Sequence, residues 1–167
     1  MKPLSLILKL CLFIISILLF SCNDDDSIIY FNSFENSSDL RGWDGLDKSS
    51  FADDVPNIFG GKKSVLISGG CVYPTSKYTI SPRGDDAFIR VECFGKNLSF
   101  GGQIVLCLDE EYNTKPSITI ENTSWTHYRS ENVFYWPANS SLTICLNSGG
   151  FVGSSMLIDE LKIEKAF

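Results

Sequence analysis

Few side chains in this 167-residue chain have the chemistry for covalent catalysis. His127 is the single histidine, and nucleophilic catalysis needs a base within reach of the nucleophile. It falls in a segment with strand character, between Trp125 and Arg129, where a histidine is usually structural. The acids at 109–111 are of the type that a glycosidase uses, but they end an apolar run, where acids usually solvate a turn. No Gly-x-Ser-x-Gly, phosphate-loop or His-Glu-x-x-His motif occurs, so the sequence predicts a protein that is not an enzyme.

Aromatic and polar side chains offer a different chemistry, the binding of sugars. A flat ring can stack on the apolar face of a pyranose while nearby polar groups bind its hydroxyls. Tyr73, Tyr112 and Trp136 lie in turn-like stretches, where a ring can stand free, and Arg90 and Asn147 point from the non-core faces of different predicted strands. These residues form the predicted carbohydrate-binding site. The alternative for each of them is an ordinary surface position.

The cysteines divide into those near the N-terminus and those in the body of the chain. Of six, four lie beyond residue 22, at positions 71, 93, 107 and 145. An even number in an exported domain favours disulfides. Cys107 and Cys145 both lie on the face opposite the Leu/Ile sets of their strands, so adjacent strands would bring them opposite each other. The alternative is four reduced, buried thiols, and without a Cys-x-x-Cys motif zinc is not expected.

One carboxylate stands in an apolar strand. Asp159 lies between Ile158 and Leu161, and an ionised carboxylate in such a place needs a partner. A bound cation, a lysine or a backbone cap would each serve.

Charge and composition exclude two classes of protein. The chain has 14 Lys+Arg against 20 Asp+Glu, for a formal net charge of −6. A nucleic-acid-binding protein would need a basic face, so nucleic acid is not an expected partner. With 44% hydrophobic residues the chain is too apolar for an intrinsically disordered one. Its length fits about one domain.

The first 21 residues have the layout of a secretory signal. Two lysines precede a short apolar core, which is typical of such signals and too short for a spanning helix. The sequence Leu19-Phe20-Ser21-Cys22 that follows resembles a bacterial lipobox, which implies cleavage before Cys22 and its acylation. The acidic run in 22–27 resembles the surface-export signal of Bacteroidetes lipoproteins; a plain solvated spacer is the alternative. The expected location is the outer membrane, with surface exposure left open.

From residue 28 onward the chain is patterned as strands. Segments 87–93, 103–108, 142–146 and 156–163 alternate apolar and polar residues with a period of two, which is typical of half-buried strands. Clusters of Gly, Asn, Ser and Pro separate them. Short strands at this spacing predict an all-β sandwich or barrel over residues 28–167.

The order of several short motifs narrows the fold further. Phe34-Glu35, Gly42-Trp43, a Gly-Gly-Lys-Lys-Ser-Val-Leu stretch at 60–66, a Trp-led strand from Trp125 to Trp136, and Ile158-Asp159 follow one another. This succession resembles the jelly-roll carbohydrate-binding modules of the galactose-binding-like superfamily. The resemblance covers about residues 29–165 and implies a two-sheet jelly-roll β-sandwich.

The resemblance also implies a structural calcium. In the resembled modules an early Glu and a late Asp hold the ion between the first and last strands, and the matching residues here are Glu35 and Asp159. Asp53 and Asp54 lie in the intervening loop and could add oxygen ligands. Trp43 and Trp125 fall at positions that are usually packing residues.

Two functions compete on this reading. The first is a lipid-anchored, non-catalytic protein that binds carbohydrate at the cell surface, with the bilayer and a glycan as partners. The second is an envelope interaction, adhesion or structural subunit, which uses the same fold without a sugar site and binds envelope proteins. A free-standing glycoside-active enzyme is a distant third.

Overall fold

The computed structural model is a two-layered β-sandwich and describes residues 27–57, 60–69, 74–109, 111, 117–150 and 152–167. Its elements follow one another as β1 (Ile28–Asn32), β2 (Trp43–Asp44), the 3-10 helix η1 (Lys48–Ser50), β3 (Phe51–Ala52), β4 (Ser64–Ser68), β5 (Ser76–Ile80), β6 (Ala87–Ser99), β7 (Gly102–Leu108), β8 (Ile118–Ile120), β9 (Thr126–Arg129), β10 (Phe134–Trp136), β11 (Leu142–Ser148) and β12 (Ser155–Lys165). Within these ranges no helix is long and apolar enough to cross a membrane.

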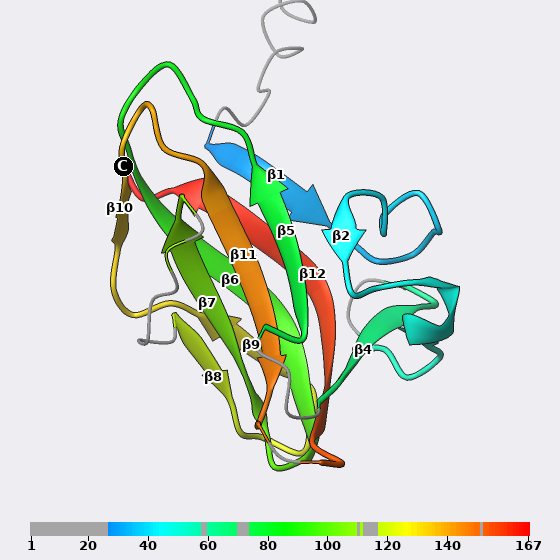
Figure 1. The fold of residues 1–167 in the computed structure, drawn as a ribbon. Coiled ribbons are helices and arrows are strands. Elements are labelled where there is room, and N and C mark those ends of the chain that lie inside the picture. Colours follow the sequence, from blue (N-terminus) through cyan, green and yellow to red (C-terminus); the bar gives the residue numbers. More distant parts are fainter. Residues whose placement is uncertain (1–26, 58–59, 70–73, 110, 112–116, 151) are drawn as a thin grey trace, which may run out of the picture.

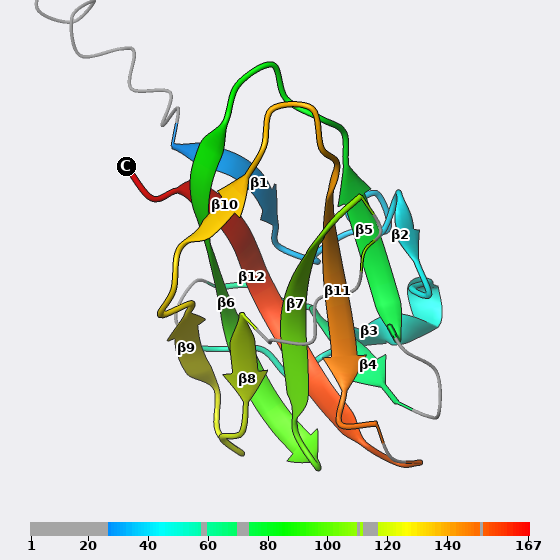
Figure 2. The same cartoon turned by 60° about the vertical axis from the view of Figure 1, so that its left-hand side comes forward.

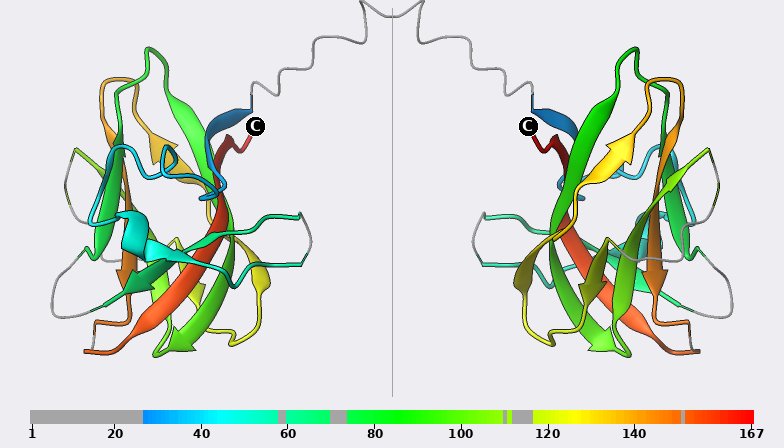
Figure 3. Two further views of the ribbon diagram at one scale, coloured as in Figure 1. Left: turned by 90° about the vertical axis from the view of Figure 1, so that its right-hand side faces the viewer. Right: turned by 90° about the vertical axis from the view of Figure 1, so that its left-hand side faces the viewer.

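The strands form two antiparallel sheets. The seven-stranded sheet has the order β10-β6-β12-β4-β3, with β1 beside β12 and β9 beside β6, and the five-stranded sheet has the order β2-β5-β11-β7-β8. Figures 1 and 2 show the long strands β6 and β12 in one layer and β5, β11 and β7 in the other. Seen edge-on, the two layers face each other across the core (Figure 3). The all-β jelly-roll prediction is confirmed.

The core forms because each strand alternates. Leu142, Ile144 and Leu146 of β11 point inward and are fully buried, while the residues between them face the other side of the sheet. Ile89 and Val91 of β6 are buried against them from the opposite layer. Each such side chain contributes roughly 1.5–3 kcal/mol on leaving water, so the pattern seen in the sequence also fixes which face of each strand can carry a site.

Two expectations about tryptophan-bearing segments need correction. The predicted single strand from Trp125 to Trp136 is divided into β9 and β10, which pair with different parts of β6. Trp43 is a core residue as predicted. Trp125 is only half-buried, and its indole N–H donates to the Asp54 carboxylate at 2.8 Å.

Candidate functional site

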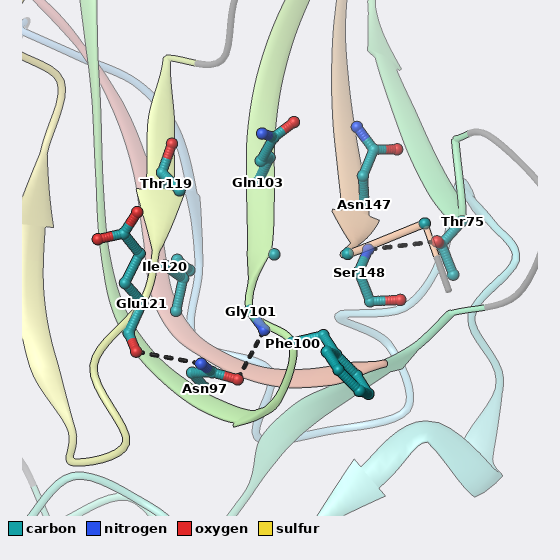
Figure 4. A pocket seen from close by; sticks show the side chains of 13 residues that line it. Thr75, Asn97, Phe100, Gly101, Gln103, Thr119, Ile120, Glu121, Asn147 and Ser148 are labelled. Carbon is teal, nitrogen blue, oxygen red and sulfur yellow. Dashed lines mark hydrogen bonds between the residues drawn. The ribbon is translucent and has the colours of Figure 1, made fainter. Parts of the chain in front are cut away.

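A row of polar side chains crosses the outer face of the five-stranded sheet. Thr119 of β8 lies directly opposite Gln103 of β7, and Gln103 lies directly opposite Asn147 of β11. Thr75, just before β5, continues the row, and its hydroxyl accepts a hydrogen bond from the Ser148 N–H at 3.4 Å. Figure 4 shows these side chains standing side by side on neighbouring elements. With strands about 4.8 Å apart, the row is roughly 14 Å long.

The row belongs to the face that the core does not use. On β8 the neighbours Ile118 and Ile120 are buried in the core, and on β7 Ile104 is. Because successive side chains of a strand point to opposite faces, Thr119 and Gln103 must point outward. The alternation that builds the core therefore also aligns the polar row.

Asn147 is the most informative member of the row. Its side chain is only 6% exposed, and within the described residues neither its amide nitrogen nor its amide oxygen has a hydrogen-bond partner. A buried polar group without a partner costs about 1–3 kcal/mol. An amide that can donate and accept is the natural partner of a ligand hydroxyl, so Asn147 is placed to bind a polyhydroxylated ligand.

An exposed aromatic ring stands beside the row, at the turn that leads into β7 (Figure 4). Phe100 is 71% exposed and occupies the turn between β6 and β7 together with Gly101. Both residues have positive φ, 59° and 71°, a conformation that is rare for a bulky side chain. At Gly101 a Cβ atom would lie 2.7 Å from the Ile120 carbonyl oxygen, so glycine is required there. A strained backbone that presents an aromatic ring is typical of binding sites.

Asn97 holds this turn in place. Its side-chain amide donates to the Glu121 carbonyl at 3.1 Å, and its side-chain oxygen accepts from the Gly101 N–H at 2.7 Å (Figure 4). These two bonds tie the end of β6 to the start of β7 and to the residue that follows β8. The ring of Phe100 is thereby fixed relative to the polar row.

The row and the turn enclose a depression of about 460 Å³, within the range of small-molecule sites. We call it the polar groove. Its lining combines amides, hydroxyls and glycines with one aromatic ring and one carboxylate: Thr75, Asn97, Phe100, Gly101, Gly102, Gln103, Thr119, Ile120, Glu121, Asn147, Ser148, Gly149 and Gly150. Such a surface can stack on an apolar ring and hydrogen-bond its hydroxyls.

Of the predicted carbohydrate-binding residues, the structure places one in the polar groove. Asn147 lies there. Arg90 belongs to β6 in the seven-stranded sheet, where it lies opposite Glu164 of β12 in the register of the two strands. Arg90 and Asn147 therefore lie on different sheets, and the prediction that they meet at one site is wrong. Tyr73 and Tyr112 lie outside the described residues.

Trp136 is not an exposed platform. It is 1% exposed in β10, and its indole N–H donates to the Ser140 carbonyl at 2.7 Å. Its neighbour in β10, Tyr135, points outward instead. The sequence around Trp136 resembles a turn, but it forms a short strand in which exposed and buried side chains alternate. The prediction that the ring of Trp136 stands free is therefore wrong.

Sequence reasoning missed most of the groove. Gln103 and Thr119 carry no motif, and their alignment depends on the register of β7 with β8. Phe100 had a signal that could have been used, because an aromatic residue followed by two glycines at a strand end places a ring at a tight turn. Asn147 is recognised by a buried side-chain amide of which neither the nitrogen nor the oxygen has a hydrogen-bond partner among the described residues. Only the three-dimensional structure reveals this.

The structure places the two cysteines of the predicted disulfide on neighbouring strands. Cys107 and Cys145 lie on the outer face of the five-stranded sheet, as expected, with their sulfurs 3.7 Å apart. They are diagonal rather than directly opposite, because Thr143 faces Cys107 and Val105 faces Cys145. Val105 and the two cysteines form a small buried cluster next to the polar row, so the disulfide between them stays a prediction.

The two predicted metal ligands are brought together. A Cβ atom on Gly61 would lie 2.5 Å from Glu35 Oε1 and 3.8 Å from Asp159 Oδ2, so both carboxylates converge on one point. The Glu35 carboxylate also accepts from the backbone N–H of Lys62 at 2.9 Å. Asp159 is buried, and it precedes a bulge at which Glu160 takes a positive φ of 50° and the pairing of β12 with β6 shifts.

The electrostatics of this pair suit a cation. Burial, with a smaller contribution from Glu160 and Glu35, raises the pKa of Asp159 to about 7. Burial also raises the pKa of Glu160, with Glu35 adding to it. A Ca²⁺ ion would supply positive charge beside the buried carboxylate of Asp159.

The rest of a calcium shell is not made of acidic side chains. In the described part of the chain no group of three or more His, Cys, Asp or Glu residues has metal-holding geometry. Asp53 pairs with the ammonium of Lys63, and Asp54 accepts from Lys96 Nζ at 2.6 Å. Backbone carbonyls and water would therefore complete any shell built on Glu35 and Asp159.

The groups considered for catalysis have structural contacts. Asp109 accepts from the Ser141 N–H at 2.8 Å, and hydrogen bonds from Ser140 and Ser141 hold its pKa below the usual range. His127 lies on β9, 3.5 Å from the carboxylate of Glu92. Neither lines the polar groove.

The comparisons with known proteins identify the fold. No protein-family model matches the chain, and no curated protein matches its sequence. Among solved structures it is similar to the CBM22-1 xylan-binding domain from Paenibacillus barcinonensis, with 16% identity and a TM-score of 0.52 over 84% of this chain and 95% of that one. It is likewise similar to the C-terminal family 22 carbohydrate-binding module of a Clostridium thermocellum protein, with 16% identity and a TM-score of 0.54 over 86% and 96%.

A third similar structure joins such a module to a further module. It is the N-terminal part of a Clostridium thermocellum endo-1,4-β-D-xylanase, with modules CBM22-1 and GH10 complexed with xylohexaose. There the identity is 15% and the TM-score 0.52, over 85% of this chain and 29% of that one. At these identities the comparisons establish a jelly-roll fold of the carbohydrate-binding-module type.

Proposed function

We propose that this protein binds a polysaccharide in the polar groove and does not act on it chemically. The observation that carries the proposal is the buried, unpartnered amide of Asn147, aligned with Gln103 and Thr119 beside the exposed ring of Phe100. A ligand hydroxyl would give that amide the hydrogen bonds it lacks, and the ring would cover an apolar sugar face.

The charge of the groove favours a neutral polysaccharide. Among the described residues that line it, Glu121 is the one charged side chain, and none is a lysine or an arginine. An anionic polysaccharide would find no cationic partner there. The similar structures named above include a xylan-binding domain and modules complexed with xylohexaose, so extended, neutral β-linked chains such as xylan are the ligands to test first.

The test is a titration with matched asparagine variants. The protein from residue 23 is titrated calorimetrically with xylan, mannan and glucan oligosaccharides. Asn147→Ala should weaken binding about tenfold, the equivalent of 1–2 kcal/mol for lost hydrogen bonds. Asn139→Ala, which removes an exposed amide outside the groove, should bind like the wild type. Equal affinities for the two variants would refute the groove as the site.

A folded protein that binds no glycan would favour the second function, an envelope interaction module. The observation in its favour is the apolar cluster of Val105, Cys107 and Cys145 beside the polar row. That cluster makes part of the face poor in sugar-binding groups.

The proposal includes a lipid anchor at Cys22 in an outer membrane. Its support is the charged and apolar layout of residues 1–21 and the Ser21-Cys22 junction. Cys22→Ala should abolish incorporation of labelled palmitate, whereas Cys11→Ala, within the expected signal, should leave the mature protein labelled.

A structural calcium bound by Glu35 and Asp159 completes the proposal. The ion would join the segment after β1 to β12 and so stabilise the fold, and it would take no part in ligand chemistry. The convergence of the two carboxylates on Gly61 supports it.

A further inference from the structure

Three exposed aromatic rings form a patch at one end of the seven-stranded sheet. Phe88, Tyr135 and Phe167 are 44%, 46% and 85% exposed. The ring centroid of Phe88 lies 5.3 Å from that of Tyr135 and 5.3 Å from that of Phe167. Phe88 and Tyr135 are directly paired across β6 and β10. We call these three residues the aromatic patch.

The patch lies on the outer face of the sheet, away from the core. Ala87 and Ile89, the neighbours of Phe88, are buried, as is Trp136 beside Tyr135. The rings of the patch therefore do not complete the core. Three clustered, exposed rings indicate a place of contact with another apolar surface.

The N-terminal segment joins the domain next to this patch. The Ser27 carbonyl accepts from the Lys165 N–H at 2.7 Å, and the Phe88 carbonyl accepts from the Ala166 N–H at 2.7 Å. Residues 165–167, at and just beyond the end of β12, therefore lie beside both Ser27 and Phe88. Figures 1 and 3 show the start of β1 and the C-terminal residue at the same end of the sandwich.

The distance to an acylated Cys22 is short. Ser27 is the fifth residue after Cys22, and a fully extended chain spans at most about 3.6 Å per residue. An acyl group on Cys22 therefore holds Ser27, and the patch beside it, within about 18 Å of the bilayer.

We propose that the aromatic patch rests on the surface of the bilayer to which the protein is anchored. The inference rests on the proposed acylation of Cys22. Phenylalanine and tyrosine suit the headgroup region, because their rings are apolar and the tyrosine hydroxyl remains in polar surroundings. The acyl chains confine the domain near the membrane, and the rings give it an orientation there.

Two acidic side chains near the aromatic patch have hydrogen-bonding or ion-pair partners. The Tyr135 hydroxyl donates to the Asp86 carboxylate at 2.9 Å. Glu164, farther along β12, is paired with Arg129 at 2.6 Å and Lys162 at 2.8 Å. Both of these acids are therefore engaged within the described part of the chain.

This orientation turns the polar groove toward the solution. Phe88 stands near the start of β6 and Phe100 just beyond its end, with about 40 Å of extended strand between them at 3.3 Å per residue. With Phe88 on the bilayer, the groove faces away from it. A polysaccharide could then reach the groove without meeting lipid.

The test compares two aromatic positions in the full acylated chain. Phe88→Trp and Phe100→Trp each replace an exposed ring by a ring of the same kind, at opposite ends of β6. Each variant is reconstituted in vesicles of phosphatidylethanolamine and phosphatidylglycerol, with and without lipids brominated near the glycerol backbone. The fluorescence of the parent, with its three tryptophans, is subtracted.

A ring held about 5–10 Å into the headgroup boundary should be quenched by the bromines. We expect quenching of the added tryptophan at 88 and none at 100. Equal quenching at the two positions overturns the inference. Crosslinking between chains through position 88 would overturn it as well, because a second copy would then cover the patch.

Flotation and glycan titration of the same samples separate the possible failures. A chain that does not float with the vesicles lacks the anchor, and the docking inference falls with it. A chain that floats without quenching at 88 overturns docking alone. Glycan binding by the Phe88→Trp variant tests the groove independently of both.

Discussion

The outer faces of the two sheets both carry polar side chains, but they differ in how far these are satisfied, and Arg90 Nε is the buried group of the seven-stranded sheet that has no hydrogen-bond partner among the described residues. On the seven-stranded sheet, Glu92 and Glu164 alternate with Arg129 and Lys162 in a closed ion network, with contacts of 2.6–3.1 Å. A hydrogen bond from Lys162 helps hold the pKa of Glu164 below its usual value. On the five-stranded sheet, the amide of Asn147 is buried without any partner in the described chain.

The difference shows which polar groups serve the fold and which can serve a ligand. Side chains that satisfy one another gain little from a third partner, because a new contact must replace an existing one. An unpaired buried amide has already lost its water, so a ligand that bonds to it recovers that cost. This difference supports the polar groove as the proposed binding face and the ion network as a stabilising one.

The largest expected effect tests which aromatic ring belongs to the binding face. Trp136→Ala should cost about 3–5 kcal/mol of folding free energy, because it empties a large core site. Phe100→Ala should leave the unfolding midpoint nearly unchanged and weaken glycan binding about tenfold, or 1–2 kcal/mol. Denaturant titration and calorimetry measure the two. A Trp136→Ala protein that is as stable as the wild type but binds glycan more weakly would mean that the Trp136 ring contacts the ligand.

The cysteine pair next to the polar row, on the same outer face, gives the next effect. A disulfide between Cys107 and Cys145 would close a loop of 38 residues and stabilise the fold by about 2–4 kcal/mol. The oxidised, exported protein should then lose stability in dithiothreitol. Cys145→Ser should remove that dependence, whereas Cys93→Ser, at a buried thiol of the other sheet, should keep it. Mass spectrometry that finds both thiols free in the exported protein would end this prediction.

The calcium pair gives an effect of similar size that depends on pH. At a concentration one hundred times the dissociation constant, an ion that binds only the folded state adds about 2.7 kcal/mol. Without calcium, the pKa of Asp159 is raised to about 7 from an ordinary value of 3.8. The folded state then binds more protons at Asp159 than the unfolded one, so the contribution of this group to stability is largest below about pH 4 and is lost as the pH rises through 7.

Calcium should cancel that loss, so its stabilising effect should grow from acid to neutral pH. Melting curves in EDTA and in calcium at several pH values check this. Asp159→Asn should make the EDTA sample more stable at pH 8 and remove the response to calcium. If wild-type melting is the same in EDTA and calcium at pH 8, Glu35 and Asp159 bind no calcium.

A smaller pair of effects sets the two faces directly against each other. Glu92→Gln should cost about 1–2 kcal/mol, because Arg129 and Lys162 lose their shared partner, and it should leave glycan binding unchanged. Asn147→Ala should leave stability within about 0.5 kcal/mol of the wild type or raise it, because an unsatisfied amide is removed. Both variants are measured by urea unfolding and by glycan titration. If only Asn147→Ala lost stability, Asn147 would serve the fold and the assignment of the two faces would be wrong.

The fold was accessible from the sequence because it depends on local alternation. The period of two in 103–108 and 142–146 predicted the inward faces of β7 and β11, and both are buried as expected. The convergence of Glu35 with Asp159 followed from the resemblance to jelly-roll modules, since it depends on the connection of first and last strands rather than on neighbours in the chain.

The binding site was less accessible because it depends on register and on burial. Asn147 could be assigned to a non-core face, but its alignment with Gln103 and Thr119 requires knowing which strands pair and in which register. Trp136 was misplaced because a three-residue strand is too short to show alternation. Arg90 was misplaced because a non-core face can belong to either sheet.

The smallest expected effect concerns Arg90, which the sequence placed in the same site as Asn147. Arg90 lies on β6, across from Glu164 of β12, on the face of the ion network. Arg90→Ala should therefore change glycan affinity by less than about 0.3 kcal/mol, the size expected of a residue without ligand contact, while Asn147→Ala weakens it about tenfold. The two variants, titrated with the same oligosaccharide, compare one residue from each outer face. A loss of affinity in Arg90→Ala as large as that in Asn147→Ala would mean that the ligand contacts both sheets, and the groove on the five-stranded sheet would then be only part of the site.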